Sequence, residues 1–283
     1  DLKFLLSPLD LYEWFSVITG GFPEPYTFGK RVLNHIKKNK PDFDIFLDNQ
    51  SLCHSLPRIQ ELYPLAVTIH HPITKDHKLE MESASNWKER LSSKRWHSFL
   101  PMQKSVARKL NNIICVSGPS KVDVVQEFNV DPKKVEVILN GIDIETFKPH
   151  AEANIIKNKI VTTASADIPL KGLRLLICAL PKVIKKFPQT TLEVIGRSPK
   201  ESKIRKLIKE LGLNERIIFR SELSEKEIVE IYSTSEIAVI PSLYEGFGFG
   251  AGEAMACGVP LISTDSGGLK DVIGDSAVKS NLD

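Results

Sequence analysis

The most diagnostic part of this chain is the stretch Ser242-Leu-Tyr-Glu-Gly-Phe-Gly-Phe-Gly-Ala-Gly-Glu-Ala-Met-Ala-Cys-Gly258, which surrounds a glycine-rich turn. Residues 236–240 before the turn form a short apolar run, as is typical of a buried parallel strand. Residues 253–257 favour a helix that stops at Gly258. The turn therefore joins the carboxyl end of a strand to the amino end of a helix. Open α/β sheets bind ligands at such a place, and the helix start offers N–H groups to phosphate.

Two carboxylates, Glu245 and Glu253, are the only charged groups of this turn, and glycines alternate with other residues between them. The glycines let a backbone approach a ligand closely. A carboxylate accepts two hydrogen bonds from vicinal hydroxyls, so one glutamate can bind a transferred sugar and the other a nucleotide ribose. Taken alone, the turn is equally compatible with a solvated Glu245 and with a Glu253 that only complements the helix dipole.

Two other strand ends carry loops of a similar kind. The strand expected at 159–164 is followed by the loop 165–172, in which Lys171 stands just ahead of a helix. A cation at a helix amino end is unfavourable unless an anion is present, so Lys171 is a candidate partner for a diphosphate. A third turn, 264–268, follows the strand expected at 259–263. Three loops with candidate ligand-binding residues or glycines thus follow the carboxyl ends of three strands, at the same edge of one sheet.

Apolar β-prone runs alternate with helix-prone runs along the chain, which predicts parallel sheets made of right-handed βαβ units. In the first half we expect strands at 43–48, 65–70, 112–116 and 135–139 and helices near 28–38, 56–62 and 120–128. In the second half we expect strands near 160, 192, 217, 238 and 261. A domain boundary is expected close to Pro149, which gives domains 1–149 and 150–283.

Composition and charge are those of an ordinary globular protein. The chain has 283 residues, of which 42% are hydrophobic and 26% charged, and its net charge of +3 does not indicate a nucleic-acid partner. The cysteines are widely spaced without metal-ligand pairing, so we interpret them as reduced thiols and expect a cytoplasmic location: Cys53, Cys115, Cys178 and Cys257.

Membrane contact is expected to be peripheral if it occurs. No apolar run approaches the ~20 residues that span a bilayer, and the start at Asp1 has no signal-peptide pattern. Basic residues gather in 37–40 and along 88–109, where they could face acidic lipid headgroups at the inner face of a membrane. A solvated helix face explains these cations equally well.

The motifs of the second half resemble the retaining glycosyltransferases of family 4, known as glycosyl transferases group 1, which have the two-domain GT-B architecture. The family pattern has two glutamates that flank seven residues, as Glu245 and Glu253 do, followed by segments like 254–260 and Gly267-Gly268-Leu269. Residues 140–149 are similar to the family segment that leads from the first domain to the second. The resemblance implies two Rossmann-like domains that face a cleft, the first on the acceptor side and the second binding the nucleotide sugar.

The resemblance also implies roles for single residues. Glu245 would contact the transferred sugar, Glu253 the ribose and Lys171 the diphosphate, while the backbone of 246–248 (Gly246, Phe247 and Gly248) would contact sugar and phosphate. An arginine often stands near the position of Ala166 in the family, and its absence here places more of the diphosphate charge on Lys171. Arg197 is a candidate helper, although an ordinary exposed loop arginine is the interpretation that we prefer.

Compared with the family, the first domain lacks its opening strands and the second lacks its closing helices. We therefore expect both domains to be truncated, as a fragment, an incomplete chain or a degenerate paralogue would be.

The first half contributes candidates for the acceptor side. His70 follows a strand end, where a family histidine commonly lines the cleft near the transferred sugar, and it is preferred over His71. The alternative for either is a satisfied structural histidine. Asn49 ends another strand, and Gly21 lies in a region where loop packing is the favoured alternative.

We therefore predict a glycosyltransferase that moves a sugar from a nucleoside-diphosphate sugar to an unknown acceptor hydroxyl, with the retained configuration that the resemblance implies. The predicted catalytic residues are His70 and Glu245. The nucleotide sugar is a co-substrate, and no cofactor or metal ion is expected. Two alternatives stay open: a GT-B-like sugar-nucleotide epimerase, and a non-catalytic protein that only binds sugar nucleotides.

Overall fold

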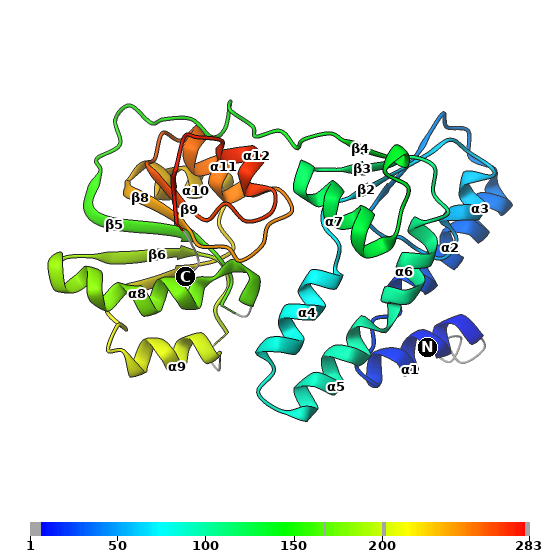
Figure 1. Ribbon diagram of the computed structural model, residues 1–283, viewed down its shortest axis with the longest axis horizontal. Helices are drawn as coiled ribbons and strands as arrows, with labels where there is room; N and C mark the ends of the chain where they lie inside the picture. The colour runs from blue at the N-terminus through cyan, green and yellow to red at the C-terminus, as the bar shows by residue number, and fades with distance from the viewer. Residues whose placement is uncertain (1–6, 167, 200–201, 281–283) are drawn as a thin grey trace. The chain divides into compact units, whose positions relative to one another are not determined.

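The computed structural model describes residues 7–166, 168–199 and 202–280. Asp167 of the loop 165–172, the start at Asp1 and the last residues 281–283 lie outside these ranges. The chain divides into two compact units, 1–139 and 140–283, each built around its own parallel sheet (Figure 1). The division thus falls about ten residues before the boundary that the sequence places at Pro149.

The first unit holds a four-stranded parallel sheet in the order β1-β2-β3-β4. Its strands are β1 (Phe46–Asn49), β2 (Leu65–Ile69), β3 (Ile113–Cys115) and β4 (Val135–Val137). Its helices are α1 (Pro8–Ile18), α2 (Glu24–Asn39), α3 (Leu56–Gln60), α4 (Thr74–Ser83), α5 (Trp87–Trp96), α6 (Leu100–Ala107) and α7 (Gly118–Phe128), with the short 3-10 helices η2 (His97–Phe99) and η3 (Pro132–Lys134). One apolar cluster that includes Leu33, Val67, Ile113 and Phe128 joins α2 and α7 to the sheet.

The second unit holds a six-stranded parallel sheet in the order β10-β9-β8-β5-β6-β7. Its strands are β5 (Ile156–Thr163), β6 (Thr191–Ile195), β7 (Ile217–Arg220), β8 (Ser235–Ile240), β9 (Leu261–Ser263) and β10 (Val278–Lys279). Its helices are α8 (Leu173–Lys186), α9 (Lys203–Glu210), α10 (Glu225–Ser233), α11 (Phe249–Ala256) and α12 (Leu269–Ile273), with the 3-10 helix η4 (Pro169–Lys171). This order is the doubly wound Rossmann arrangement, whose direction of winding reverses between β5 and β8.

Helices cover both faces of the second sheet. Figure 1 shows α8 and α9 on one side and α10, α11 and α12 on the other. Successive residues of β5 point to opposite sides, so Ile160 packs with the cluster under α8 and α9 while Val161 packs with the cluster under α10 and α11. Burial on both faces explains why the strands of this unit are apolar runs rather than alternating ones.

Most expected elements form, with shifted ends. The helix expected near 28–38 begins at Glu24, and the strand expected at 43–48 begins at Phe46. The helix α1 was not predicted, because Pro8 at its first position and the Ser7 side chain that caps Asp10 N were not recognised as a start signal. The two-residue strand β10 also has no clear sequence signal.

The cysteines carry no disulfide among the described residues. Cys53, Cys115 and Cys257 are buried, whereas Cys178 is exposed on α8. Burial raises the pKa of the Cys115 thiol to about 12 and that of Cys257 to about 11, which keeps both protonated. Within the described ranges, no helix combines the length and apolarity that crossing a bilayer requires.

Candidate functional site

The two loops that meet where the second sheet reverses its winding carry most of the predicted site. One loop follows β5 and ends at Lys171, and the other follows β8 and contains Glu245. Their backbones are joined directly, because Leu243 N donates a hydrogen bond of 2.7 Å to Leu170 O. Ligands of open α/β sheets bind in the crevice at this switch point, so these loops are the candidate ligand site of the second unit.

Lys171 and Glu245 form an ion pair of 2.7 Å between Nζ and Oε1. The Lys171 side chain is 32% exposed and that of Glu245 is 13% exposed. Ser242 Oγ donates to the same Oε1 atom at 2.8 Å, and Ser242 itself is buried. The Glu245 carboxylate is therefore held from two sides, and one of its partners is Lys171, the main candidate for binding a diphosphate.

Glycines allow the loops around Glu245 to pack closely. A Cβ at Gly172 would lie 1.8 Å from Pro241 O, and a Cβ at Gly267 would lie 2.2 Å from Glu245 O. Both residues have positive φ angles, of 64° and 60°, which glycine adopts without strain. Gly268 N donates 2.8 Å to Glu245 O, so the third predicted turn supports the turn that carries Glu245.

Helix starts without a side-chain cap surround the same edge. The cap positions of α8, α11 and α12 are Gly172, Gly248 and Gly268, and none of the three can supply a capping side chain. Free N–H groups at the start of α11 and the positive end of its dipole suit an anion such as phosphate. Gly246 and Gly248 lie in the turn before α11, and Phe247 between them is buried with its ring 5.1 Å from that of Phe249.

Glu253 lies one turn into α11 and is half-buried. Burial raises the pKa of its carboxyl group, more than the contact with Tyr232 lowers it. Tyr232 is fully buried on α10, and its hydroxyl lies 2.7 Å from Thr163 Oγ1 and 3.5 Å from Glu253 Oε2. Glu253 is thus a poorly solvated carboxyl group, whereas Glu245 is paired with a cation.

A hollow of about 630 Å³ lies over the carboxyl ends of β5, β6 and β7. It is lined by Ser165, Ile168, Gly196, Arg197, Arg220 and Ile228, among other residues. Arg197 is exposed there, and its backbone carbonyl accepts a 2.8 Å hydrogen bond from Ala166 N. Ser165 and Ile168 belong to the loop that ends at Lys171, so this loop contributes both to the hollow and to the place predicted for the diphosphate.

In the first unit, His70 lies at the end of β2 and is half-buried. Its Nε2 is 2.7 Å from Asn49 Oδ1, and its backbone N–H donates to Gln50 Oε1 at 2.5 Å. Burial, followed by the neighbouring His71, lowers the pKa of His70, which favours a neutral ring near pH 7. The structure therefore brings His70 and Asn49 together at the carboxyl edge of this sheet.

The two remaining acceptor-side candidates have local structural partners. His71 Nε2 lies 2.8 Å from Asp76 Oδ2 at the start of α4. Gly21 is buried beneath the Arg95 guanidinium, where a Cβ would lie 2.5 Å from Nη1. Arg95 also donates to Thr19 Oγ1 at 2.7 Å, so Gly21 serves the packing of α1 against α5.

Sequence reasoning missed three polar residues that contact predicted site residues. Ser242 received no predicted role, although a separation of three residues from Glu245 is typical of a local side-chain contact. Tyr232 and Gln50 contact Glu253 and His70 from distant parts of the chain, and no local pattern signals such contacts.

The two parallel sheets and the strand order at the switch point define an α/β protein of the GT-B class. Residues 146–280 match the family described as Glycosyl transferases group 1, and residues 9–146 match Glycosyltransferase Family 4. Together these matches span nearly the whole chain, and the chain belongs to the family 4 glycosyltransferases.

Individual relatives agree with this assignment. An MMP alpha-(1->4)-mannosyltransferase of Mycolicibacterium hassiacum is 37% identical over 94% of this chain and 64% of its own length. A D-inositol 3-phosphate glycosyltransferase of Corynebacterium efficiens is 30% identical over 52% of this chain and 38% of its own length. The chain therefore spans less than two thirds of either relative.

Solved structures share the fold. Sucrose-phosphate synthase from Thermosynechococcus elongatus has a TM-score of 0.68 at 22% identity, covering 87% of this chain and 61% of that one. Anabaena Alr3699/HepE in complex with UDP-glucose has a TM-score of 0.66 at 20% identity, covering 88% and 66%. These similarities confirm the GT-B fold expected from the sequence.

Proposed function

We propose that this protein transfers a glycosyl group from a nucleoside-diphosphate sugar to an acceptor hydroxyl, with retention of the anomeric configuration. The observation that supports this most is the direct contact of Lys171 with Glu245 at the switch point of the second sheet. It places a cation suited to a leaving diphosphate beside a carboxylate suited to sugar hydroxyls.

In this proposal the donor's diphosphate binds between Lys171 and the start of α11. The lysine and the backbone N–H groups near Gly248 stabilise the negative charge that develops on the leaving group. These groups take the place of a divalent cation, so we propose a reaction that needs no metal and no organic cofactor. Arg197 is a secondary candidate for the same charge.

Glu245 positions the transferred sugar, and the backbone of 246–248 contacts the sugar and phosphate. Glu253 accepts hydrogen bonds from the ribose hydroxyls, which would compensate for its poor solvation. A phosphate oxygen of the leaving group accepts the proton of the attacking hydroxyl on the same face of the sugar, and this geometry yields retention. The mannosyltransferase relative is named for an α linkage, which supports retention for a donor whose sugar is α-linked to the diphosphate.

The first unit supplies the acceptor side. His70, held by Asn49, offers a neutral imidazole to a sugar hydroxyl or to phosphate, with His71 and Gly21 as further predicted neighbours of the acceptor. The 37% identity to a mannosyltransferase favours a hexose donor and a carbohydrate acceptor. A cytoplasmic location and a peripheral contact with a membrane stay predictions.

The direct test is a transfer assay on the full-length protein. UDP- and GDP-hexoses are incubated with a panel of sugar acceptors, and the anomeric configuration of any product is determined by NMR. Transfer with a retained α configuration, abolished in Lys171→Ala, is expected. A protein that binds neither donor, or that forms a product with inverted configuration, would contradict the proposal.

A further inference from the structure

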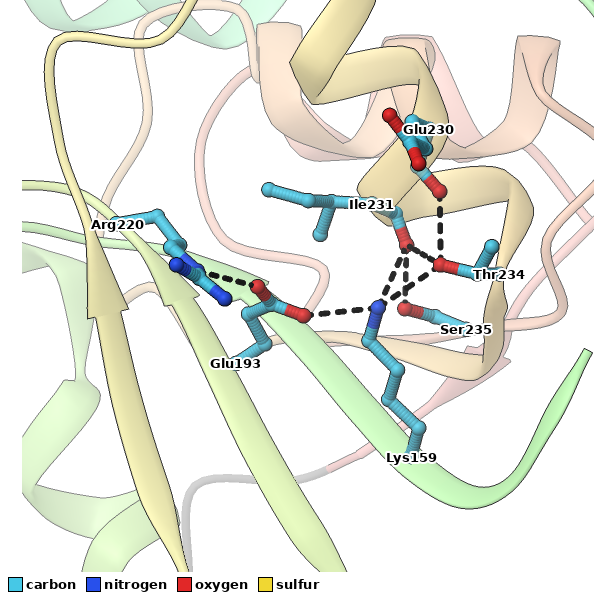
Figure 2. Close-up of polar contacts among 7 residues, drawn as sticks. All are labelled: Lys159, Glu193, Arg220, Glu230, Ile231, Thr234 and Ser235. Carbon is cyan, nitrogen blue, oxygen red and sulfur yellow. Dashed lines mark hydrogen bonds and ion pairs between the residues drawn. The ribbon is translucent and has the colours of Figure 1, made fainter.

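A charged network crosses the second sheet on the face that α10 covers (Figure 2). Lys159 of β5 lies 2.8 Å from Glu193 Oε2 of β6, and Arg220 of β7 donates from Nε to Glu193 Oε1 at 2.9 Å. The Lys159 and Glu193 side chains are only 8% and 11% exposed. The network therefore links the buried Lys159–Glu193 pair to Arg220. The Arg220 side chain is 52% exposed and lies at the end of β7.

The buried end of this network is fully paired. Lys159 Nζ also donates to Thr234 Oγ1 at 2.9 Å and to Ile231 O at 3.4 Å, which occupies its three N–H groups. Burial alone would raise the pKa of Glu193, but hydrogen bonds and charge from Lys159 and Arg220 outweigh it and lower the pKa. A buried ion pair is poor evidence for stability, because apolar residues of similar volume often serve as well. A role in orienting Arg220 accounts for the network better.

Arg220 presents unused donors to the hollow beside the predicted diphosphate site. Only its Nε contacts Glu193, and within the described part of the chain neither terminal NH2 group has a hydrogen-bond partner. Arg220 lines the hollow together with Ser165 and Ile168 of the loop that leads to Lys171. The guanidinium is thus held at one nitrogen, and its terminal nitrogens are available to a ligand in the hollow.

The loop after Arg220 is strained in the same place. Glu222 has φ of 60°, a left-handed conformation that is unfavourable for a residue other than glycine. Glu222 also lines the hollow, two residues from Arg220 in the chain. A donor fork and an acceptor on one wall match the mixed donors and acceptors on the edge of a nucleobase.

We infer that Arg220 contacts the base of the bound nucleoside diphosphate and determines which base is accepted, while Glu193, neutralised by Lys159, holds the guanidinium in position. This inference rests on the proposed function, because the hollow receives the base only if the diphosphate lies at Lys171. Arg220 is then a specificity-determining residue, and Glu193 is a positioning residue that acts through it.

The test is calorimetry of the full-length protein with UDP, GDP and ADP. We expect the wild type to prefer one of the three, and Arg220→Ala to weaken that nucleotide about tenfold or more while the other two change less. Lys171→Ala should weaken all three by the same factor, because it removes a contact to the shared diphosphate. Arg216→Ala, at the opposite end of β7 and outside the hollow, is the matched control and should change none.

The outcomes separate this inference from the proposed function. Wild-type protein that binds none of the nucleotides overturns the proposed function itself. Binding that is sensitive to Lys171→Ala but equal for all three bases, or equally weakened for all three by Arg220→Ala, upholds the donor site and overturns the role of Arg220.

The positioning role of Glu193 has its own measurement. Glu193→Gln should lower the preference among the three nucleotides in the same direction as Arg220→Ala, by a smaller factor. Because this single substitution would leave Lys159 buried without its counterion, the Lys159→Met/Glu193→Gln double variant provides a neutral alternative. Arg220→Lys, which keeps the charge but not the fork, should not restore the preference. An unchanged preference in the folded Glu193 variants would contradict the positioning role.

Discussion

Lys171 Nζ lies 2.7 Å from Glu245 Oε1, although 74 residues separate the two in the chain. The residue proposed to bind the diphosphate and the residue proposed to bind the sugar thus form an ion pair with each other. If the donor's phosphate binds Lys171 as proposed, the Glu245 carboxylate would become available to the sugar, and Ser242 Oγ would still donate a hydrogen bond to it.

Lys171→Ala should weaken the binding of nucleoside diphosphate by about 1.5 to 3 kcal/mol, the usual range for a hydrogen bond to a charged group. Isothermal titration calorimetry with UDP and GDP measures the loss. Lys182→Ala, which removes an exposed lysine from the helix that follows, is the matched control. Equal affinities of Lys171→Ala and wild type would exclude the assigned role.

Substitutions of the two glutamates of the turn should have different effects on transfer and on nucleotide affinity. Glu245→Gln is expected to reduce transfer and leave the affinity for free nucleoside diphosphate nearly unchanged, because the sugar is absent from that ligand. Glu253→Ala is expected to weaken the free nucleotide, because its proposed partner is the ribose diol. If titration shows the reverse, the donor lies in the site in the opposite orientation.

His70→Ala should reduce kcat by about tenfold or more and change the affinity for the donor nucleotide far less, since a small misplacement of a reacting group is costly. Steady-state kinetics and calorimetry must be measured on the same preparation. His71→Ala, whose ring contacts Asp76, is the comparison variant. An equal loss of turnover and binding would make His70 a plain binding residue, and no loss in either would make it structural.

The ionised Glu253 carboxylate should lower the free energy of unfolding at neutral pH. Burial raises its pKa above the ordinary value of 4.5, so the folded state holds the proton more tightly than the unfolded state. The free energy of unfolding then falls as the pH rises from about 4.5 through the folded pKa. Glu253→Gln should therefore raise Tm at pH 7 to 8, and the gain should shrink toward pH 4.

Thermal unfolding followed by circular dichroism at several pH values checks this prediction. Glu227→Gln is an instructive contrast, because hydrogen bonds from Ser224 lower the pKa of Glu227 and its loss should destabilise the protein at neutral pH. A Glu253→Gln variant that is less stable than wild type at pH 8 would show that the carboxylate is well solvated or paired after all.

Removal of divalent cations should leave transfer unchanged, because Lys171 and the start of α11 are proposed to carry the diphosphate charge. The measurement compares initial rates in EDTA with rates in added Mg²⁺ or Mn²⁺. Activity that disappears in EDTA and returns with either ion would contradict the metal-free reaction.

Local patterns in the sequence were enough to predict many of the strands and helices of this fold. The apolar run before Ser242 and the helix-prone run before Gly258 predicted β8 and α11, because strand and helix preferences depend on neighbouring residues. The family motif around Glu245 and Glu253 likewise predicted the GT-B fold, which the matches to known families and structures confirm. Helix α1 was not predicted, because its start signals were not recognised: a capping serine, a proline at the first position and Asp10 in the first turn.

The sequence by itself thus determined the strand–turn–helix units and the residue types at their ends. Only the tertiary structure decided which ends meet. The pairing of Lys171 with Glu245 depends on β5 lying beside β8, and the chain Lys159–Glu193–Arg220 depends on the order β5-β6-β7. Strand order arises from burying both faces of a sheet beneath helices, a non-local packing problem that leaves no mark on the residues near each strand.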